Sequence, residues 1–60
     1  MDDKLLTIEE AAQFLTVKTS TLRSAVFRRK IAFVKIGRLV RFKLYDLKVY
    51  VSKNTREAIM

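Results

Sequence analysis

The sequence lacks cysteine and histidine and has a single glycine among its 60 residues. Without cysteine no disulfide can form, and without either residue the usual ligands of a structural zinc site are missing. A chain of this length buries only about 60 % of the surface that its unfolded form exposes, so we expect marginal stability. Stability must therefore come from a compact apolar core, from a partner, or from both.

The same absences argue against an enzyme. Histidine is the commonest general base and cysteine the usual thiol nucleophile, and the lone Gly37 provides no glycine-rich loop for a phosphate. The carboxylates lie toward the two ends of the chain, and the sequence does not predict a pair with a raised pKa among them. The sequence thus predicts no catalytic residue, no metal site and no cofactor.

No repeat, low-complexity tract or linker marks a second domain. We expect one domain over residues 1–60, with a core over 5–51 and a tail over 52–60 that either frays or extends the last helix. No apolar run approaches the ~18 residues of a membrane span and no secretory signal is visible, so a cytoplasmic protein is expected.

Positive charge is concentrated in the middle of the chain. Thirteen Lys and Arg residues face six Asp and Glu residues, for a formal net charge of +7. Between residues 11 and 45 there is no acidic residue, whereas nine basic residues fall there. A solvated surface usually mixes both signs, so this distribution favours a polyanionic partner. A soluble domain that merely happens to be basic is the alternative.

The first half of the chain predicts two short helices. Thr7 and Glu10 have capping-box spacing, and apolar residues at i, i+3, i+4 and i+7 then predict a helix over about 8–15. The pattern breaks at 16–18, and a second helix is expected to begin at Thr19 or one residue earlier. Two short helices with so short a joint indicate a helix-turn-helix, whose second helix can lie in a DNA major groove. An ordinary helical hairpin with a polar outer face is the alternative.

On the DNA-binding interpretation, the outward face of the second helix carries short hydroxyls that permit close approach and basic side chains that reach phosphates or guanine edges. These residues are Lys18, Thr19, Ser20, Arg23, Ser24 and Arg28. Phe27 is an aromatic on that same face. We favour its packing against the third helix or the hairpin; a protein–protein contact and stacking on a base are the other interpretations.

Residues 34–43 predict a β-hairpin, because apolar and basic residues alternate on both sides of Gly37. A two-residue loop would mix charge into the apolar face. A three-residue loop over 37–39 separates the faces and sets Lys35 opposite Arg41, so we expect this register. Like charges opposed across a strand pair are unfavourable unless an anion lies nearby. The apolar face then holds Val34, Ile36, Val40 and Phe42.

The hairpin is therefore expected to be the wing of a winged helix-turn-helix. Arg38 at its tip is expected to enter the adjacent minor groove. Leu44, Leu47, Tyr50 and Val51 follow at helical spacing and predict a third helix over about 44–52. The resulting fold class is α+β, with two short helices, a β-hairpin wing and a third helix. The wing residues assigned to DNA are Lys35, Arg38, Arg41 and Lys43.

The chain resembles the excisionase-type DNA-binding domains, which are relatives of the MerR-like winged helices of mobile elements, phages and plasmids. The resemblance covers about residues 5–51 and includes Leu6-Thr7-Ile8-Glu9-Glu10-Ala11-Ala12, Leu15, Val17, Thr21-Leu22, Val34-Lys35-Ile36-Gly37-Arg38, Arg41-Phe42 and Asp46-Leu47. It implies that the second helix reads the major groove and the wing touches the minor groove. It also places Arg23 on the DNA backbone and Arg38 at the wing tip.

Three features depart from the family pattern. Thr16 stands where the family often has glycine, Lys18 where a capping serine is usual, and Arg29-Lys30 replaces a common Gly-acid pair.

The expected function is sequence-preferring binding of double-stranded DNA, as an excisionase-like architectural accessory factor that bends DNA and assists a recombinase. A MerR-like transcriptional regulator and a terminase-type DNA-recognition domain are alternatives within the family. RNA binding and a protein-interaction module are alternatives of another class. A duplex is favoured over a single strand because few aromatics are available for stacking. A recombinase or integrase, and a second copy of the chain on DNA, stay open as further partners. With no effector domain following, a stand-alone protein is expected.

Overall fold

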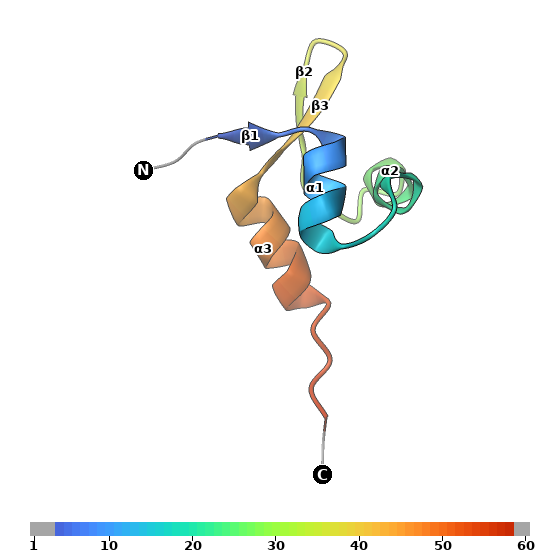
Figure 1. Cartoon of the computed structure of the whole chain (residues 1–60), viewed down its shortest axis with the longest axis vertical. Coiled ribbons are helices and arrows are strands. Elements are labelled where there is room, and N and C mark those ends of the chain that lie inside the picture. Colours follow the sequence, from blue (N-terminus) through green and yellow to red (C-terminus); the bar gives the residue numbers. More distant parts are fainter. Residues whose placement is uncertain (1–3, 59–60) are drawn as a thin grey trace.

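The structure, a computed structural model that describes residues 4–58, consists of three short helices and a small antiparallel sheet (Figure 1). The strand order is β1-β3-β2. This α+β arrangement confirms the predicted winged helix-turn-helix. Along the chain the elements are β1 (Leu5–Leu6), α1 (Ile8–Leu15), α2 (Thr19–Phe27), β2 (Val34–Ile36), β3 (Leu39–Lys43) and α3 (Leu44–Lys53).

The start of α1 is the predicted capping box. The Thr7 backbone N–H donates to the Glu10 carboxylate at 2.9 Å, and the Glu10 N–H donates to the Thr7 hydroxyl at 3.1 Å. The bond from the Thr7 N–H lowers the pKa of the Glu10 carboxyl, with smaller contributions from the positive charges of Lys4 and Arg41. α1 is in contact with β3, so the base of the wing lies near α1.

The other two helices also begin where the sequence predicts. α2 begins at Thr19, although Lys18 before it makes no side-chain capping bond. α3 runs to Lys53, one residue beyond the predicted 52. It ends where the Asn54 side-chain amide donates to the Tyr50 carbonyl at 2.8 Å. Residues 54–58 have no regular secondary structure, and the last two residues of the predicted tail lie outside the described part of the chain.

The turn after α1 is built without glycine. The Val17 N–H donates to the Ala12 carbonyl at 3.0 Å and the Thr16 N–H to the Gln13 carbonyl at 3.1 Å, which is the hydrogen-bond pattern of a Schellman motif. Such a motif needs one residue in the left-handed region, and here Thr16 has φ 60°. A β-branched residue is strained in that region, whereas glycine is not.

The end of α2 repeats this arrangement. The Lys30 N–H donates to the Ala25 carbonyl at 2.8 Å and the Arg29 N–H to the Val26 carbonyl at 3.0 Å, with Arg29 at φ 58°. Arg29 therefore belongs to the turn and not to α2. It lies beyond the helix, exposed, in the turn that leads toward the wing.

The wing forms as a hairpin, but the predicted three-residue loop is wrong. The paired residues are Val34 with Arg41, Lys35 with Val40, and Ile36 with Leu39, so the loop is the two residues Gly37-Arg38. Of these two only Gly37 has positive φ, at 60°, which is the φ pattern of a type II′ turn. Lys35 consequently faces Val40, and the predicted opposition of Lys35 and Arg41 does not occur.

Burial explains why the turn and not the apolar alternation sets this register. Only the base of the wing reaches the core, where Phe42 is completely buried. At the tip, Ile36 is 51 % and Leu39 54 % exposed, so the predicted burial of Ile36 is also wrong. A strand register is specified by its hydrophobic pattern only where one face is covered. At an uncovered tip, the turn that best matches strand twist prevails.

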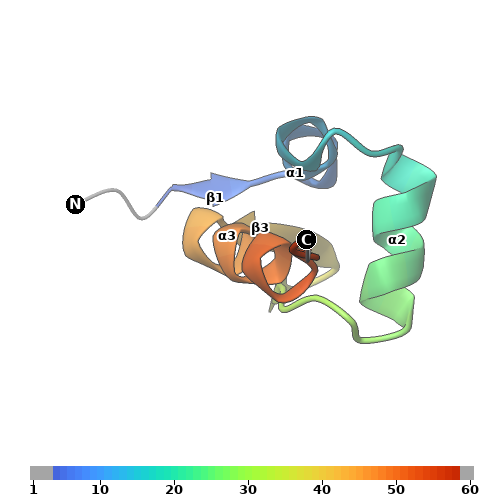
Figure 2. The same ribbon diagram turned by 90° about the horizontal axis from the view of Figure 1, so that it is seen from below.

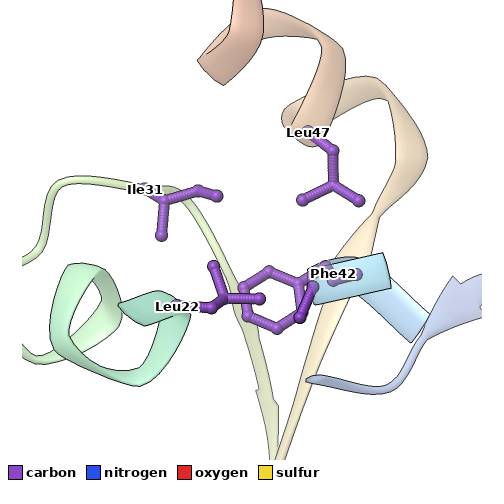
Figure 3. Packing of buried hydrophobic residues seen from close by; sticks show 6 residues of the cluster. Leu22, Ile31, Phe42 and Leu47 are labelled. Atoms are coloured by element: carbon purple, nitrogen blue, oxygen red, sulfur yellow. The ribbon is translucent and has the colours of Figure 1, made fainter. Parts of the chain in front are cut away.

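The core is a small cluster between the helices and the base of the sheet. Figure 3 shows Leu22, Ile31 and Leu47 pointing toward a common centre at the Phe42 ring. Ala11 and Ala12 complete the cluster, and their small side chains let α1 lie close to its neighbours. Ile31 comes from the connection after α2 and had no predicted core role. Val51, which was expected on the buried face of α3, is 48 % exposed.

The strand β1 was not predicted. Leu5 pairs with Lys43 and Leu6 with Phe42, so β1 covers the edge of β3 that β2 leaves free. Two residues are too short to show a strand period, and their pairing depends on a partner about 37 positions away. The sheet edge thereby holds the chain just before the Thr7 cap.

Candidate nucleic-acid interface

α2 has one face on the core and the other exposed along its length. Figure 2 shows α2 crossing the side of the molecule, next to α1. Leu22 is its only buried residue. Ser20, Ser24 and Phe27, at i, i+4 and i+7, form one outward ridge, and all three are exposed. The two serines are short, so this ridge can approach a surface closely along its first two turns.

Phe27 does not pack against the third helix or the hairpin, and the favoured sequence interpretation is therefore wrong. Its side chain is 88 % exposed, more than that of any other large hydrophobic residue described. The physical reason is that α2 ends at Phe27, and the turn through Arg29 carries the chain away without covering it. The outward ridge thus ends in an uncovered phenyl ring.

A hollow of about 610 Å³ lies between α2 and the wing. Arg23, Val26 and Phe27 line it from α2, Arg38 to Arg41 line it from the wing, and α1 contributes Ile8 and Glu9. Three arginines therefore meet there with one carboxylate. Arg23, Arg38 and Arg41 are all residues that the sequence assigned to DNA, and the fold brings them to one place from two elements.

A second hollow, of about 510 Å³, lies on the other side of Phe27. It is lined by Arg29 and Lys35 together with the apolar side chains Val26, Phe27 and Phe33 and with Val40 of the wing. Arg29 was not among the predicted DNA-binding residues. One feature of the sequence could have identified it. Arg29 stands where the family commonly has glycine, and a glycine there indicates a turn, in which a side chain is exposed.

The remaining α2 residues face a third hollow, toward α3. Ser20, Ser24 and Arg28 line it with Lys30, opposite Tyr50 of α3. The predicted recognition residues are therefore divided between the two flanks of α2. Arg23 lies on the wing side and Arg28 on the α3 side, and the two serines of the outward ridge between them border the hollow toward α3.

The other predicted site residues differ in exposure and position. Lys18 is exposed at the beginning of α2, whereas Thr19 is half-buried. Arg41 is half-buried, and its guanidinium donates to the Val40 carbonyl at 2.8 Å. Lys43 is exposed at the end of β3 far from the wing tip, beside β1, and lines none of the three hollows around α2.

A basic helix beside a basic hairpin can follow a nucleic-acid backbone, because helix and hairpin present cations at two separate points along it. Fold and surface together define the class: a winged helix-turn-helix domain. The chain belongs to the helix-turn-helix domain family, whose model matches residues 5–55. This is a family of DNA-binding domains, so membership suggests DNA binding here and is typical of a non-enzymatic protein. No curated protein and no solved structure matches the chain significantly.

No cluster of three or more His, Cys, Asp or Glu side chains suited to a metal ion occurs within residues 4–58. Over the same range, every helix falls short of the length and apolarity that a membrane crossing requires.

Proposed function

We propose that this domain binds double-stranded DNA with sequence preference through α2 and the wing, as an excisionase-like architectural accessory factor of a mobile element or phage. The observation that carries the proposal is the meeting of Arg23 with Arg38 and Arg41 at the hollow between α2 and the wing. Membership of a DNA-binding family supports it independently.

The charge distribution supports a duplex backbone as the ligand. The two hollows beside Phe27 are lined by five basic residues and one acidic residue, Glu9. If each basic residue neutralises one phosphate, log affinity should fall against log salt with a slope of about −5. The five are Arg23, Arg29, Lys35, Arg38 and Arg41.

Arg23→Ala and Arg38→Ala are each expected to weaken duplex binding by about tenfold at low salt, because each removes a charge-assisted contact to phosphate. Each should also reduce the salt slope by about one. Both side chains are exposed, so the free energy of unfolding should stay unchanged. Fluorescence anisotropy with a labelled duplex, repeated between about 50 and 200 mM salt, measures both quantities.

Lys48→Ala is the matched control, since Lys48 is an exposed cation on α3 that lines none of the hollows described above. If all three variants lose affinity equally, the surface assigned to DNA is wrong. Competition with an RNA duplex of the same sequence separates the nucleic acids, and a preference for RNA would overturn the choice of DNA.

The architectural role has its own test. A protein that bends DNA brings the two ends of a short duplex closer together, so energy transfer between end-attached dyes should rise on binding. Sequence-preferring binding with no change in energy transfer would contradict the accessory role and favour a small transcriptional regulator. Binding itself would remain supported in that case.

A further inference from the structure

We propose that Phe27 determines sequence preference by packing against the 5-methyl group of a thymine in the major groove. This inference rests on the proposed DNA binding and names the feature of the ligand that the surface reads. Phe27 combines high exposure, a place on the outward ridge of α2 and surroundings of basic residues, and these three observations together identify its partner.

The exposure of Phe27 leaves its ring available to a ligand. Phe27 is 88 % exposed at the end of a helix, and neither neighbouring hollow encloses it. Transfer of a phenyl ring from water to an apolar contact is favourable in proportion to the area covered. A bound ligand that covers Phe27 therefore gains affinity without any rearrangement of the domain.

Phe27 is the last residue of α2. Phe27 continues the ridge of Ser20 and Ser24, and it is much longer than either serine. When a helix lies in a major groove about 12 Å wide, such a ridge faces the base edges. The serines allow the helix to settle deeply, so Phe27 reaches the bases or the groove wall. The apolar group that a base pair presents there is the thymine methyl.

The ring is surrounded by positive charge, which matches the phosphates of a DNA backbone. The hollows on both sides of Phe27 carry Arg23, Arg38 and Arg41 on one side and Arg29 and Lys35 on the other. Glu9 is the only carboxylate among their lining residues. An apolar contact flanked by phosphates matches this pattern, since a thymine methyl lies beside the backbone of its own strand.

The test uses duplex DNA in which single thymines are replaced by deoxyuridine, which removes only the methyl group. A preferred sequence is first selected from a random duplex pool with the full chain. Each thymine is then replaced in turn, and the dissociation constant is measured by fluorescence anisotropy. At one or two positions the substitution should weaken binding about fourfold, the value of one buried methyl group.

Phe27→Ser supplies the matched variant, because it extends the serine ridge and removes the ring. It should bind the thymine duplex more weakly than the wild type does and should bind the thymine and deoxyuridine duplexes equally. Tyr45→Ser is the control: Tyr45 is 73 % exposed on α3, outside both hollows, and should retain the full response to the methyl group. Thermal denaturation by circular dichroism should give the same midpoint for Phe27→Ser as for the wild type.

The outcomes separate the two proposals. Tight, selective binding that deoxyuridine leaves unchanged at every position would overturn the role of Phe27 and leave DNA binding intact. The role of Phe27 is equally overturned if Phe27→Ser keeps the response to the methyl group, or if it changes only self-association measured by sedimentation. If the pool yields no enriched duplex and no binding at low salt, both the proposed function and this inference fail.

Discussion

Replacement of Thr16 by glycine should stabilise this protein. Thr16 holds the left-handed conformation that ends α1, at φ 60°, and its side chain is exposed. An L-residue pays about 1–2 kcal/mol in that conformation, and glycine is free of this cost. This gain is partly offset, because glycine loses about 0.5–1 kcal/mol more conformational entropy on folding. The net expectation is a gain of about 0.5–1 kcal/mol in the free energy of unfolding.

In a domain of this size, such a gain raises the melting temperature by roughly 2–8 °C. Urea denaturation followed by circular dichroism measures the free energy, and a thermal scan measures the melting temperature. The hydrogen bonds from Val17 to Ala12 and from Thr16 to Gln13 involve only backbone atoms, so the substitution leaves them in place.

Two control variants test whether the left-handed conformation of Thr16 is the source of the gain. Thr16→Ala keeps a Cβ in the left-handed region and should gain much less than Thr16→Gly. Gln13→Gly places glycine at an exposed position inside α1 and should destabilise by about 1 kcal/mol. If Thr16→Gly is destabilising, or if Thr16→Ala stabilises just as much, the account of the turn after α1 is incorrect.

Two further predictions concern the core and the capping box. Phe42→Ala should cost about 3–5 kcal/mol, a large part of the stability of so small a domain, because Phe42 is fully buried at the centre of the core. Urea denaturation checks this against Tyr45→Ala, and equal stability of the two variants would contradict the assigned core. The lowered pKa of Glu10 means that its ionised form stabilises the folded state at pH values above the ordinary glutamate pKa. This contribution is lost as the pH falls through the lowered pKa, so the stability difference between the wild type and Glu10→Gln should shrink below about pH 4. A difference that is constant from about pH 7 to about pH 3 would contradict the role of the Thr7 bond.

The local signals along the chain were sufficient to predict the helices. The spacing of Thr7 and Glu10 located the beginning of α1, and the break at 16–18 located α2 at Thr19. These features depend on residues three or four positions apart, so they can be recognised before any tertiary contact is known. The concentration of basic residues between 11 and 45 likewise indicated the kind of partner without reference to the fold.

The candidate site was predictable in its composition and only partly in its geometry. Arg23 and Arg38 were identified from the sequence, but that they line one hollow is a consequence of how α2 and the wing pack. Arg29 was missed and Phe27 was misplaced, because the positions of both depend on the turn that ends α2. A Schellman turn without glycine gives little warning in the sequence, and its direction decides which side chains stay uncovered.

What the sequence determined by itself is the set of helices with the hairpin, their order and the basic character of one surface. The tertiary structure alone decided the register of the wing, the pairing of β1 and the exposure of Phe27. For the wing the physical reason lies in burial. Side-chain alternation specifies a strand face only where a core covers it, and the core of this domain reaches Phe42 at the base of the wing but not the tip at Gly37. The pairing of β1 and the exposure of Phe27 likewise depend on which parts of the chain come together in space, and no spacing within one element records that.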